Sequence, residues 1–177
     1  MRVNKAELAR ELYRACYLEG EFVLRSGQTA NFYFDKYQFE AAPALLAAVA
    51  ELAREMVPPE TEVLAGLELG GVPVSTALSL ATGLPQVLVR KQAKTYGTAK
   101  LAEGPDVAGR RALVVEDVVT TGGQVVLSTE DLRARGAIVD TVLCVIDRRP
   151  DPGQGEDKLA AAGLRLVPVF TLADLLP

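Results

Sequence analysis

The chain has 177 residues, a formal net charge of −4 and a hydrophobic fraction of 49%. These values are typical of one globular domain spanning residues 1–177, and they argue against a general nucleic-acid-binding protein, which needs clustered Lys and Arg. Histidine is absent and Cys16 lies far from Cys144, so zinc sites and His-based catalytic triads have almost nothing to be built from. No stretch resembles a membrane span or a signal peptide, which predicts a cytoplasmic protein without a membrane partner.

The first third of the chain predicts two helices around an aromatic extended region. Asn4 followed by Glu7 resembles a capping box, which marks a helix start. The expected elements are a helix ending at Gly20, two extended segments within 21–39 joined at Ser26-Gly27, and a helix from Pro43 to Met56. Aromatic side chains are unusually dense from Phe32 to Phe39.

From residue 62 onward, strands and helices alternate. The predicted order is strand 62–67, turn 68–71, helix 72–81, strand 86–90, a long polar stretch, strand 112–116, a threonine-glycine turn, a helix to about Arg135 with Gly136 as its C-cap, and strand 140–147. The tail adds a loop rich in Pro and Gly, a short helix, a late strand and a capped turn that opens at Thr171. This series predicts an α/β fold whose central sheet is mostly parallel and flanked by helices on both faces.

The segment "ALVVEDVVTTGG", residues 112–123, joins two acids to a turn suited to an anion. A buried parallel strand would place Glu116 and Asp117 at its carboxyl end, where ligands bind in open α/β sheets. Thr120 to Gly123 offer hydroxyls and backbone N–H groups that can hold a phosphate at the start of a helix. Carboxylates repel phosphate, so the acids should face sugar hydroxyls, and a ribose 5-phosphate would satisfy both halves. The plainer alternative is an ordinary connection with a solvated acidic tip.

A cationic segment follows the strand at 86–90. Arg90, Lys91, Lys94 and Lys100 all precede the first acid, Glu103. A long cationic loop at the ligand edge is typical of a lid that neutralises a phosphate leaving group. A solvated surface loop is the alternative, since charge runs are usually solvated.

Aromatic and cationic residues also occur together in "FYFDKYQF" and "IDRRP". Aromatic rings beside Arg or Lys can stack on and charge-pair with a flat anionic ring. Arg148 follows a predicted strand and should therefore lie at the same edge as the acids. For any single aromatic of the first stretch, packing in the core is the alternative.

Together these segments resemble the type I phosphoribosyltransferases. "EDVVTTGG" looks like that family's phosphoribosyl pyrophosphate (PRPP) motif, and "RKQAKTYGT" looks like the catalytic loop of orotate phosphoribosyltransferases. The similarity covers nearly the full chain, from "FVLRSGQTANFYFD" through "IDRR" to "TLADLL". It implies the type I fold, with a small hood from about residues 20–40 and 148–177 and a long flexible catalytic loop.

The activity that the resemblance implies is transfer of ribose 5-phosphate from PRPP to N1 of orotate. The products are orotidine 5′-monophosphate and pyrophosphate, in the pathway of UMP biosynthesis. The resemblance also implies Mg²⁺ as cofactor, held mainly by substrate and water, and a homodimer whose catalytic loop closes over the neighbouring subunit's site.

The resemblance assigns roles to individual residues. The implied catalytic residues are Lys94, Arg90, Lys91 and Asp117. The implied PRPP-binding residues are Glu116, Asp117, Val118, Val119, Thr120, Thr121, Gly122, Gly123, Arg90, Lys91, Lys94, Tyr96, Gly70 and Gly71. The implied orotate-binding residues are Arg25, Tyr33, Phe34, Thr120 and Arg148.

Two positions depart from the pattern of members such as the enteric bacterial enzymes. Gly70 stands where those members carry a lysine near the pyrophosphate, so backbone N–H groups of Leu69 to Gly71 would have to serve. Tyr96 replaces a histidine of the loop, which argues against that side chain as an obligatory proton carrier.

Two rival functions share parts of this pattern. Purine phosphoribosyltransferases have the same PRPP motif, but the loop sequence and the aromatic segment with Arg25 look like the orotate branch. A PRPP-sensing regulator without catalysis would be expected to carry an added basic nucleic-acid-binding region, for which this acidic chain leaves no visible room.

Overall fold

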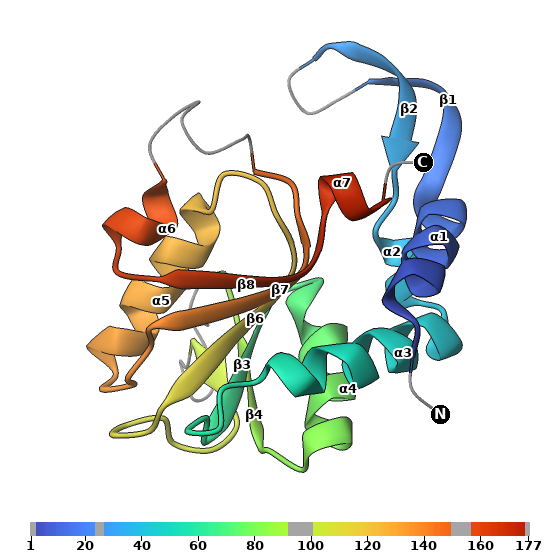
Figure 1. Cartoon of the computed structure of the whole chain (residues 1–177). Coiled ribbons are helices and arrows are strands. Elements are labelled where there is room, and N and C mark those ends of the chain that lie inside the picture. The colour runs from blue at the N-terminus through green and yellow to red at the C-terminus, as the bar shows by residue number, and fades with distance from the viewer. Residues whose placement is uncertain (1–2, 24–26, 92–100, 150–156, 176–177) are drawn as a thin grey trace.

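The computed structural model describes residues 3–23, 27–91, 101–149 and 157–175 (Figure 1). Three residues with expected roles, Arg25, Lys94 and Tyr96, lie outside these ranges.

Six strands form the main sheet, in the order β5-β4-β3-β6-β7-β8. Their bounds are β3 (Val63–Leu67), β4 (Gln86–Val89), β5 (Ala102–Glu103), β6 (Ala112–Val119), β7 (Thr141–Asp147) and β8 (Arg165–Thr171). All neighbouring pairs are parallel except β4 and β5. The predicted α/β fold with a mostly parallel sheet is therefore confirmed, while the short antiparallel edge strand β5 was not predicted.

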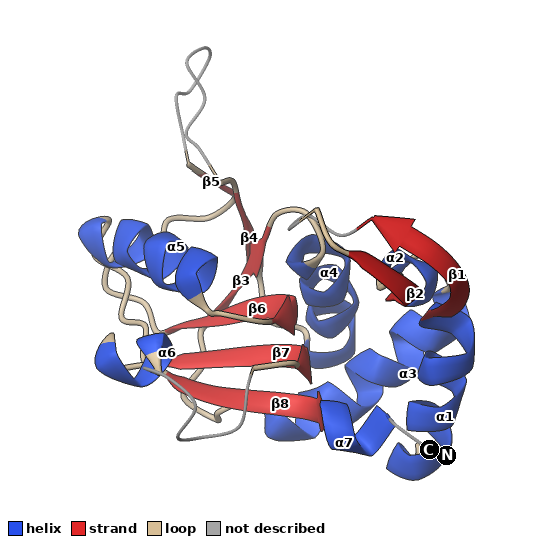
Figure 2. Ribbon diagram, turned by 90° about the horizontal axis from the view of Figure 1, so that it is seen from above, coloured by secondary structure: helices blue, strands red, loops and turns tan. Residues whose placement is uncertain are grey.

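Helices cover both faces of this sheet (Figures 1 and 2). One face carries α1 (Lys5–Cys16), α3 (Pro43–Ala53), its 3-10 continuation η1 (Arg54–Met56), α4 (Gly71–Thr82) and α7 (Leu172–Leu175). The other face carries α5 (Gly123–Ala134) and α6 (Lys158–Ala161). Because both faces are covered, β7 is buried from Thr141 to Ile146, which explains its unbroken apolar run.

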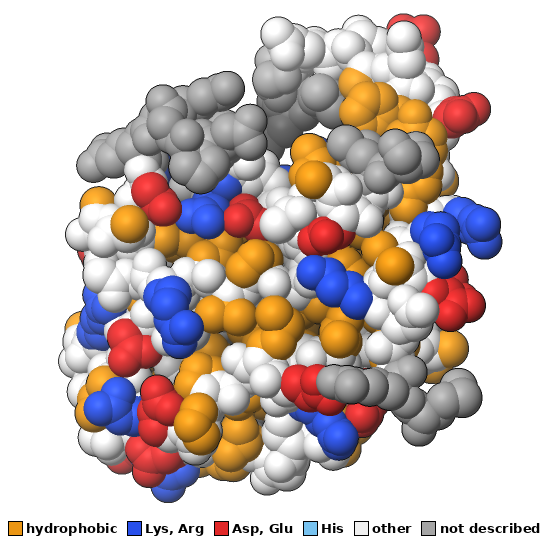
Figure 3. Space-filling view, viewed as in Figure 1, with side chains coloured by type: hydrophobic (Ala, Val, Ile, Leu, Met, Phe, Trp, Pro, Cys, Tyr) orange, Lys and Arg blue, Asp and Glu red, His pale blue; other side chains and the backbone are white. Residues whose placement is uncertain are grey.

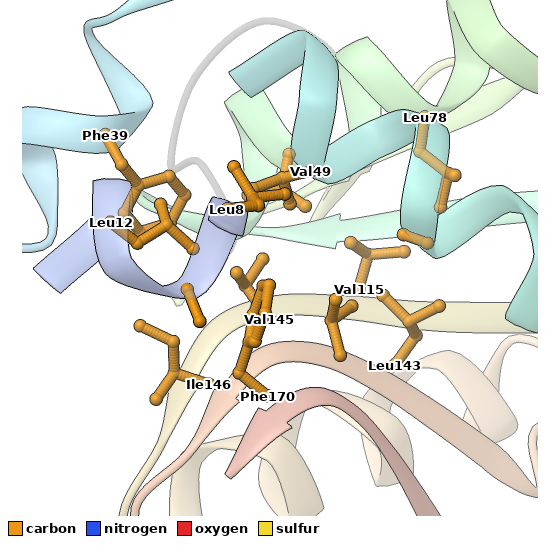
Figure 4. Packing of buried hydrophobic residues seen from close by; sticks show 14 of the residues in the cluster. Leu8, Leu12, Phe39, Val49, Leu78, Val115, Leu143, Val145, Ile146 and Phe170 are labelled. Carbon is orange, nitrogen blue, oxygen red and sulfur yellow. The ribbon is translucent and has the colours of Figure 1, made fainter. Parts of the chain in front are cut away.

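Figure 4 shows the core on the first face. Leu78 of α4 and Val49 of α3 point toward Val115 and Leu143 of the sheet, and all four side chains are almost fully buried. This packing fixes α4 against β6, so the beginning of α4 has a defined position at the carboxyl edge.

The boundary of the first helix differs from the prediction. α1 ends at Cys16, and β1 (Tyr17–Val23) follows directly and pairs antiparallel with β2 (Thr29–Phe34). The expected helix to Gly20 is therefore wrong by one turn, because Tyr17 pairs with Phe34 instead of continuing the helix. The hairpin of β1 and β2 stands above the carboxyl ends of the main sheet (Figure 1).

The aromatic segment after β2 also differs from the prediction. Residues expected to stay extended form a short helix, α2 (Tyr37–Glu40), in which Phe39 is fully buried. The Asp35 side chain accepts a hydrogen bond of 3.2 Å from the backbone N–H of Tyr37, and this local bond starts the turn.

The tail contributes less to the hood than expected. β8 is the sixth strand of the main sheet, so residues 165–171 belong to the body of the molecule. α7 instead packs beside α1, where Lys5 pairs with Asp174 at 3.3 Å. The predicted cap at Thr171 is confirmed, since its backbone N–H and hydroxyl both donate to the Asp174 carboxylate. Among the described residues, no helix is long and apolar enough to cross a membrane.

Candidate active site

Two helices begin side by side at the carboxyl edge of the sheet. The neighbouring strands β3 and β6 are each followed by a glycine-containing turn and a helix, α4 and α5 respectively. The N-cap residues are Gly70 and Gly122, and neither helix has a side-chain cap. The backbone N–H groups of both first turns can therefore receive an anion, with the positive ends of both helix dipoles behind them.

The turn before α5 needs glycine for steric reasons. Gly122 has a φ of +73°, and a Cβ atom there would lie 3.0 Å from Leu159 of α6. The preceding Thr120 and Thr121 are exposed, so their hydroxyls are open to a ligand. The residues expected to hold a phosphate thus lie together in one turn, at the edge that the sequence predicted.

The turn before α4 lies close to β6. A Cβ atom on Gly71 would lie 2.3 Å from the backbone oxygen of Val115, so a side chain there would push α4 off the sheet. A Cβ atom on Gly70 would lie 1.7 Å from Oδ2 of Asp117. The absence of a side chain on Gly70 lets the turn before α4 and Asp117 approach each other.

The acid pair is not symmetrical. β6 runs three residues beyond the predicted end at Glu116, so both acids belong to the strand. Glu116 is partly exposed, whereas the Asp117 side chain is only 1% exposed. Oδ1 of Asp117 accepts the backbone N–H of Val118 at 2.6 Å, and Oδ2 forms an ion pair with the Lys36 ammonium.

This arrangement affects the predicted role of Asp117. Its carboxylate is almost fully buried, with the backbone N–H of Val118 on one oxygen and the Lys36 ammonium on the other, so a ribose hydroxyl has little direct access to it here. The contact predicted for Asp117 requires a hydroxyl to reach a side chain that is only 1% exposed.

Burial and mutual contact separate the pKa values of three neighbouring carboxyl groups, those of Glu40, Glu116 and Asp117. Burial, followed by the hydrogen bond and charge of Asp117, raises the pKa values of Glu40 and Glu116 to about 9. Burial alone would also raise the pKa of Asp117, but hydrogen bonds from Glu116, Glu40 and Lys36 lower it below its ordinary value. Burial and contact thus favour the protonated form of the two glutamates and the ionised form of Asp117.

Arg90 and Lys91 stand where the predicted lid leaves the sheet. The Arg90 backbone N–H donates to the Leu101 carbonyl at 2.9 Å, and Arg90 Nε lies 3.7 Å from Oε1 of Glu103. The Lys91 backbone N–H donates to Oε1 of Glu68 at 2.9 Å, which ties the start of this segment to the turn before α4. Of the two cations, Lys91 is thus joined to that turn and the Arg90 side chain lies beside β5, while Lys94 and Tyr96 lie outside the described residues.

The arginines after β7 divide into one exposed and one paired residue. Arg149 bonds the carboxylates of Asp147 and Asp157, each at 3.0 Å. Arg148 is exposed, and its backbone N–H donates to the carbonyl of Val119 at 2.8 Å, which fixes it beside the end of β6. The expected orotate residue is therefore the arginine that remains open to solvent.

The hairpin presents aromatic side chains. Tyr33 is 44% exposed and its ring lies 5.6 Å from that of Phe22, whereas Phe34 is partly buried. On the other side of the hairpin, Tyr17 stacks on Phe32 at 5.5 Å. Figure 3 shows hydrophobic side chains along the hairpin and charged side chains on the body below it.

Sequence reasoning missed three residues of this edge. Lys36, Glu40 and Glu68 reach it through tertiary packing, at positions far from their partners in the chain. No spacing rule links Lys36 to Asp117. Asp35 followed by Gln38 did resemble a helix start, and this signal could have placed Lys36 and Glu40 on one short helix.

Comparisons with known proteins agree with this geometry. Residues 36–166 match the family model described as "Phosphoribosyl transferase domain". A curated orotate phosphoribosyltransferase of Nocardioides sp. is 56% identical over 170 residues, which cover 96% of this chain and 93% of the relative.

Solved structures give the same result. A crystal structure of Mycobacterium tuberculosis orotate phosphoribosyltransferase is 36% identical and has a TM-score of 0.83, with 97% of this chain and 98% of that chain covered. Another crystal structure of the Mycobacterium tuberculosis enzyme, 33% identical with a TM-score of 0.79 and covering 97% and 98% of the two chains, is a complex with PRPP. The chain therefore belongs to the orotate phosphoribosyltransferase family, whose members contain the phosphoribosyltransferase domain.

Proposed function

We propose that this chain transfers ribose 5-phosphate from PRPP to N1 of orotate, forming orotidine 5′-monophosphate and pyrophosphate for UMP biosynthesis. The single observation that carries the proposal is the pair of uncapped helix N-termini at the ends of β3 and β6, with the acids of β6 beside them. PRPP has a phosphate at one end, a pyrophosphate at the other and ribose hydroxyls between, so its groups match this order. The names of the relatives support orotate as the acceptor.

The 5′-phosphate is assigned to the turn of residues 120–123 at the start of α5. Exposed threonine hydroxyls and uncapped N–H groups are donors there, and Gly122 permits the tight turn. Val118 and Val119 precede this turn in β6 and bring the backbone to the phosphate. Glu116, the partly exposed acid, is assigned to a ribose hydroxyl.

The pyrophosphate is assigned to the turn before α4. Backbone N–H groups of residues 69–71 lie there, and Arg90 and Lys91 lie at the adjoining strand end. Lys94 and Tyr96 are proposed to join them from the loop that follows. These cations would stabilise the negative charge that develops on pyrophosphate as the bond to the ribose breaks.

Orotate is assigned to the space between the hairpin and Arg148. The exposed Arg148 guanidinium can pair with the orotate carboxylate, and Tyr33 and Phe34 can pack against the ring. Thr120 and Arg25 complete the proposed set. Because orotate is already an anion, the reaction does not need a histidine base. The protein instead has to stabilise the charges that develop on the ribose and on the departing pyrophosphate.

Mg²⁺ is proposed as the cofactor, and it would neutralise pyrophosphate oxygens when bound. The described residues contain no group of three acid, cysteine or histidine side chains able to hold a metal ion, and Asp117 is already paired with Lys36. Substrate oxygens and water are therefore the proposed main ligands.

We also propose that the protein is a cytoplasmic homodimer. In this dimer the loop of one subunit would act on the other subunit's site. Mixed dimers test this arrangement: one Lys94→Ala chain and one Asp117→Ala chain should together restore activity at one of the two sites. No recovery in purified mixed dimers, compared with each variant alone, would contradict action across the interface.

The activity is tested by following the ultraviolet absorbance of orotate after PRPP and Mg²⁺ are added to the purified protein. Adenine, hypoxanthine and uracil serve as parallel acceptors. Orotate consumption that requires both PRPP and Mg²⁺ is the expected result. Activity with a different base alone would overturn the acceptor assignment, and PRPP binding without any turnover would favour a regulator.

A further inference from the structure

A lysine that sequence reasoning assigned to no role lies at the centre of the candidate site. Lys36 precedes α2, and its ammonium pairs with Oδ2 of Asp117. About a third of the Lys36 side chain, 32%, is exposed, compared with 1% of Asp117. Of the two partners, Lys36 is therefore the one that a ligand can reach.

The ammonium lies at the beginning of α4. Oδ2, the Asp117 atom that pairs with Lys36, lies where a side chain at Gly70 would be, only 1.7 Å from the position of a Cβ atom. Gly70 is the N-cap of α4 and has no side chain of its own. Lys36 thus brings a cation to the N-terminus of α4, where the turn assigned to pyrophosphate ends.

A second residue of α2 helps to hold this position. The same Cβ atom on Gly70 would lie 2.9 Å from Oε1 of Glu40, so Glu40 and Asp117 both approach the Gly70 backbone. Two ionised carboxylates this close and buried would repel each other, whereas a proton on Glu40 allows a hydrogen bond. Burial and the contact with Asp117 raise the pKa of Glu40 to about 9, which agrees with a protonated Glu40.

The charge balance of the cluster is compatible with an anionic ligand. Lys36 and Asp117 compensate each other, and burial together with the contact to Asp117 raises the pKa values of Glu40 and Glu116, which favours their neutral forms. Three carboxyl groups beside a phosphate site therefore do not make it repulsive. The ammonium has three N–H donors, and the bond to Asp117 needs only one of them.

α2 is itself held firmly in place. Phe39 is fully buried, and the Asp35 backbone N–H donates to the Cys16 carbonyl at 2.8 Å. Lys36 and Glu40 are four residues apart and therefore lie on the same side of this short turn. The cation is preorganised by the fold, which lowers the entropy lost when a ligand binds it.

We propose that Lys36 binds the pyrophosphate group of PRPP, and that Asp117 and Glu40 are positioning residues that hold its ammonium at the N-terminus of α4. The inference rests on the proposed function for the identity of the ligand. It adds a contact from the segment between the hairpin and α2 to a site otherwise formed by the turn before α4 and the end of β4.

The test uses inorganic pyrophosphate with Mg²⁺ as the probe, measured by calorimetry without any base. Lys36→Met should weaken pyrophosphate binding about tenfold to a hundredfold, the usual effect of losing a charge-assisted hydrogen bond. Lys36→Arg should recover most of the affinity. In turnover, Lys36→Met should raise the KM for PRPP and leave the KM for orotate unchanged.

Two controls separate a ligand contact from a structural role. Lys5→Met removes another Lys–Asp pair, 3.3 Å long and located at α7, and should leave pyrophosphate affinity unchanged. The double variant Lys36→Met with Asp117→Asn removes the unpaired buried charge, so its Tm should recover while pyrophosphate affinity stays low.

Several outcomes would overturn the inference. The inference is wrong if a folded Lys36→Met protein binds pyrophosphate with wild-type affinity. It is also wrong if affinity recovers together with Tm in the double variant, or if the wild type does not bind pyrophosphate. The proposed function is judged separately, by whether the wild type consumes orotate.

Discussion

Replacing Gly122 with alanine should weaken both the fold and the phosphate site. Its φ of +73° lies in the left-handed region, which costs an alanine about 1–2 kcal/mol. The new Cβ atom would also lie 3.0 Å from Leu159, a fully buried side chain with little room to move. For a chain of this size, the backbone cost alone corresponds to a Tm lower by about 2–8 °C.

Gly123→Ala is the matched control at the next residue. Gly123 is the first residue of α5, its φ lies outside the left-handed region, and the nearest atom to a new Cβ would be 3.8 Å away. Alanine also favours helix over glycine, so the Tm should stay constant or rise. Differential scanning calorimetry checks both variants, and KM for PRPP should increase more for Gly122→Ala. Equal Tm values for the two variants would refute the steric reasoning for this turn.

Three further predictions concern other parts of the edge. Gly71→Ala should lower stability by about 1–3 kcal/mol in urea unfolding, because the new Cβ would lie 2.3 Å from a backbone oxygen of β6; unchanged stability would contradict the close packing of α4. The pKa values of Glu40 and Glu116 are about 9 when folded, above those of an unfolded chain, so their stabilising effect is complete below about pH 4.5 and is lost as pH rises through 9. The urea concentration at the unfolding midpoint should thus decrease as the pH is raised from 5 to 9, and it should decrease less steeply in Glu40→Gln. The same pH dependence in both proteins would argue against a protonated Glu40. Arg148→Ala should raise KM for orotate at constant Tm, whereas Arg149→Ala, which removes two ion pairs, should lower Tm; the reverse pattern would exchange their roles.

Local patterns predicted the body of the fold well. The continuous apolar strands and the helices between them depend on burial and on periodicity, both of which are visible in the sequence. The Thr171 cap and the turn at Gly122 were predictable for the same reason, since each depends on neighbouring residues.

Long-range contacts decided the elements that were predicted wrongly. Tyr17 leaves the helix because it pairs with Phe34, and β6 continues past Glu116 because Val118 and Val119 pair with β7. The Lys36–Asp117 contact depends on how α2 packs, and neither residue has a local signal for the other. The sequence analysis placed both acids at the ligand edge, facing sugar hydroxyls, and did not predict that the Asp117 side chain is almost fully buried.

A crystal structure of the complex with Mg²⁺ and PRPP would test the central claim most directly. We expect the 5′-phosphate within hydrogen-bonding distance of backbone N–H groups at the start of α5, and the pyrophosphate beside residues 69–71 at the start of α4. A PRPP molecule bound with either phosphate end away from its assigned helix would contradict the assignment of the two helix N-termini.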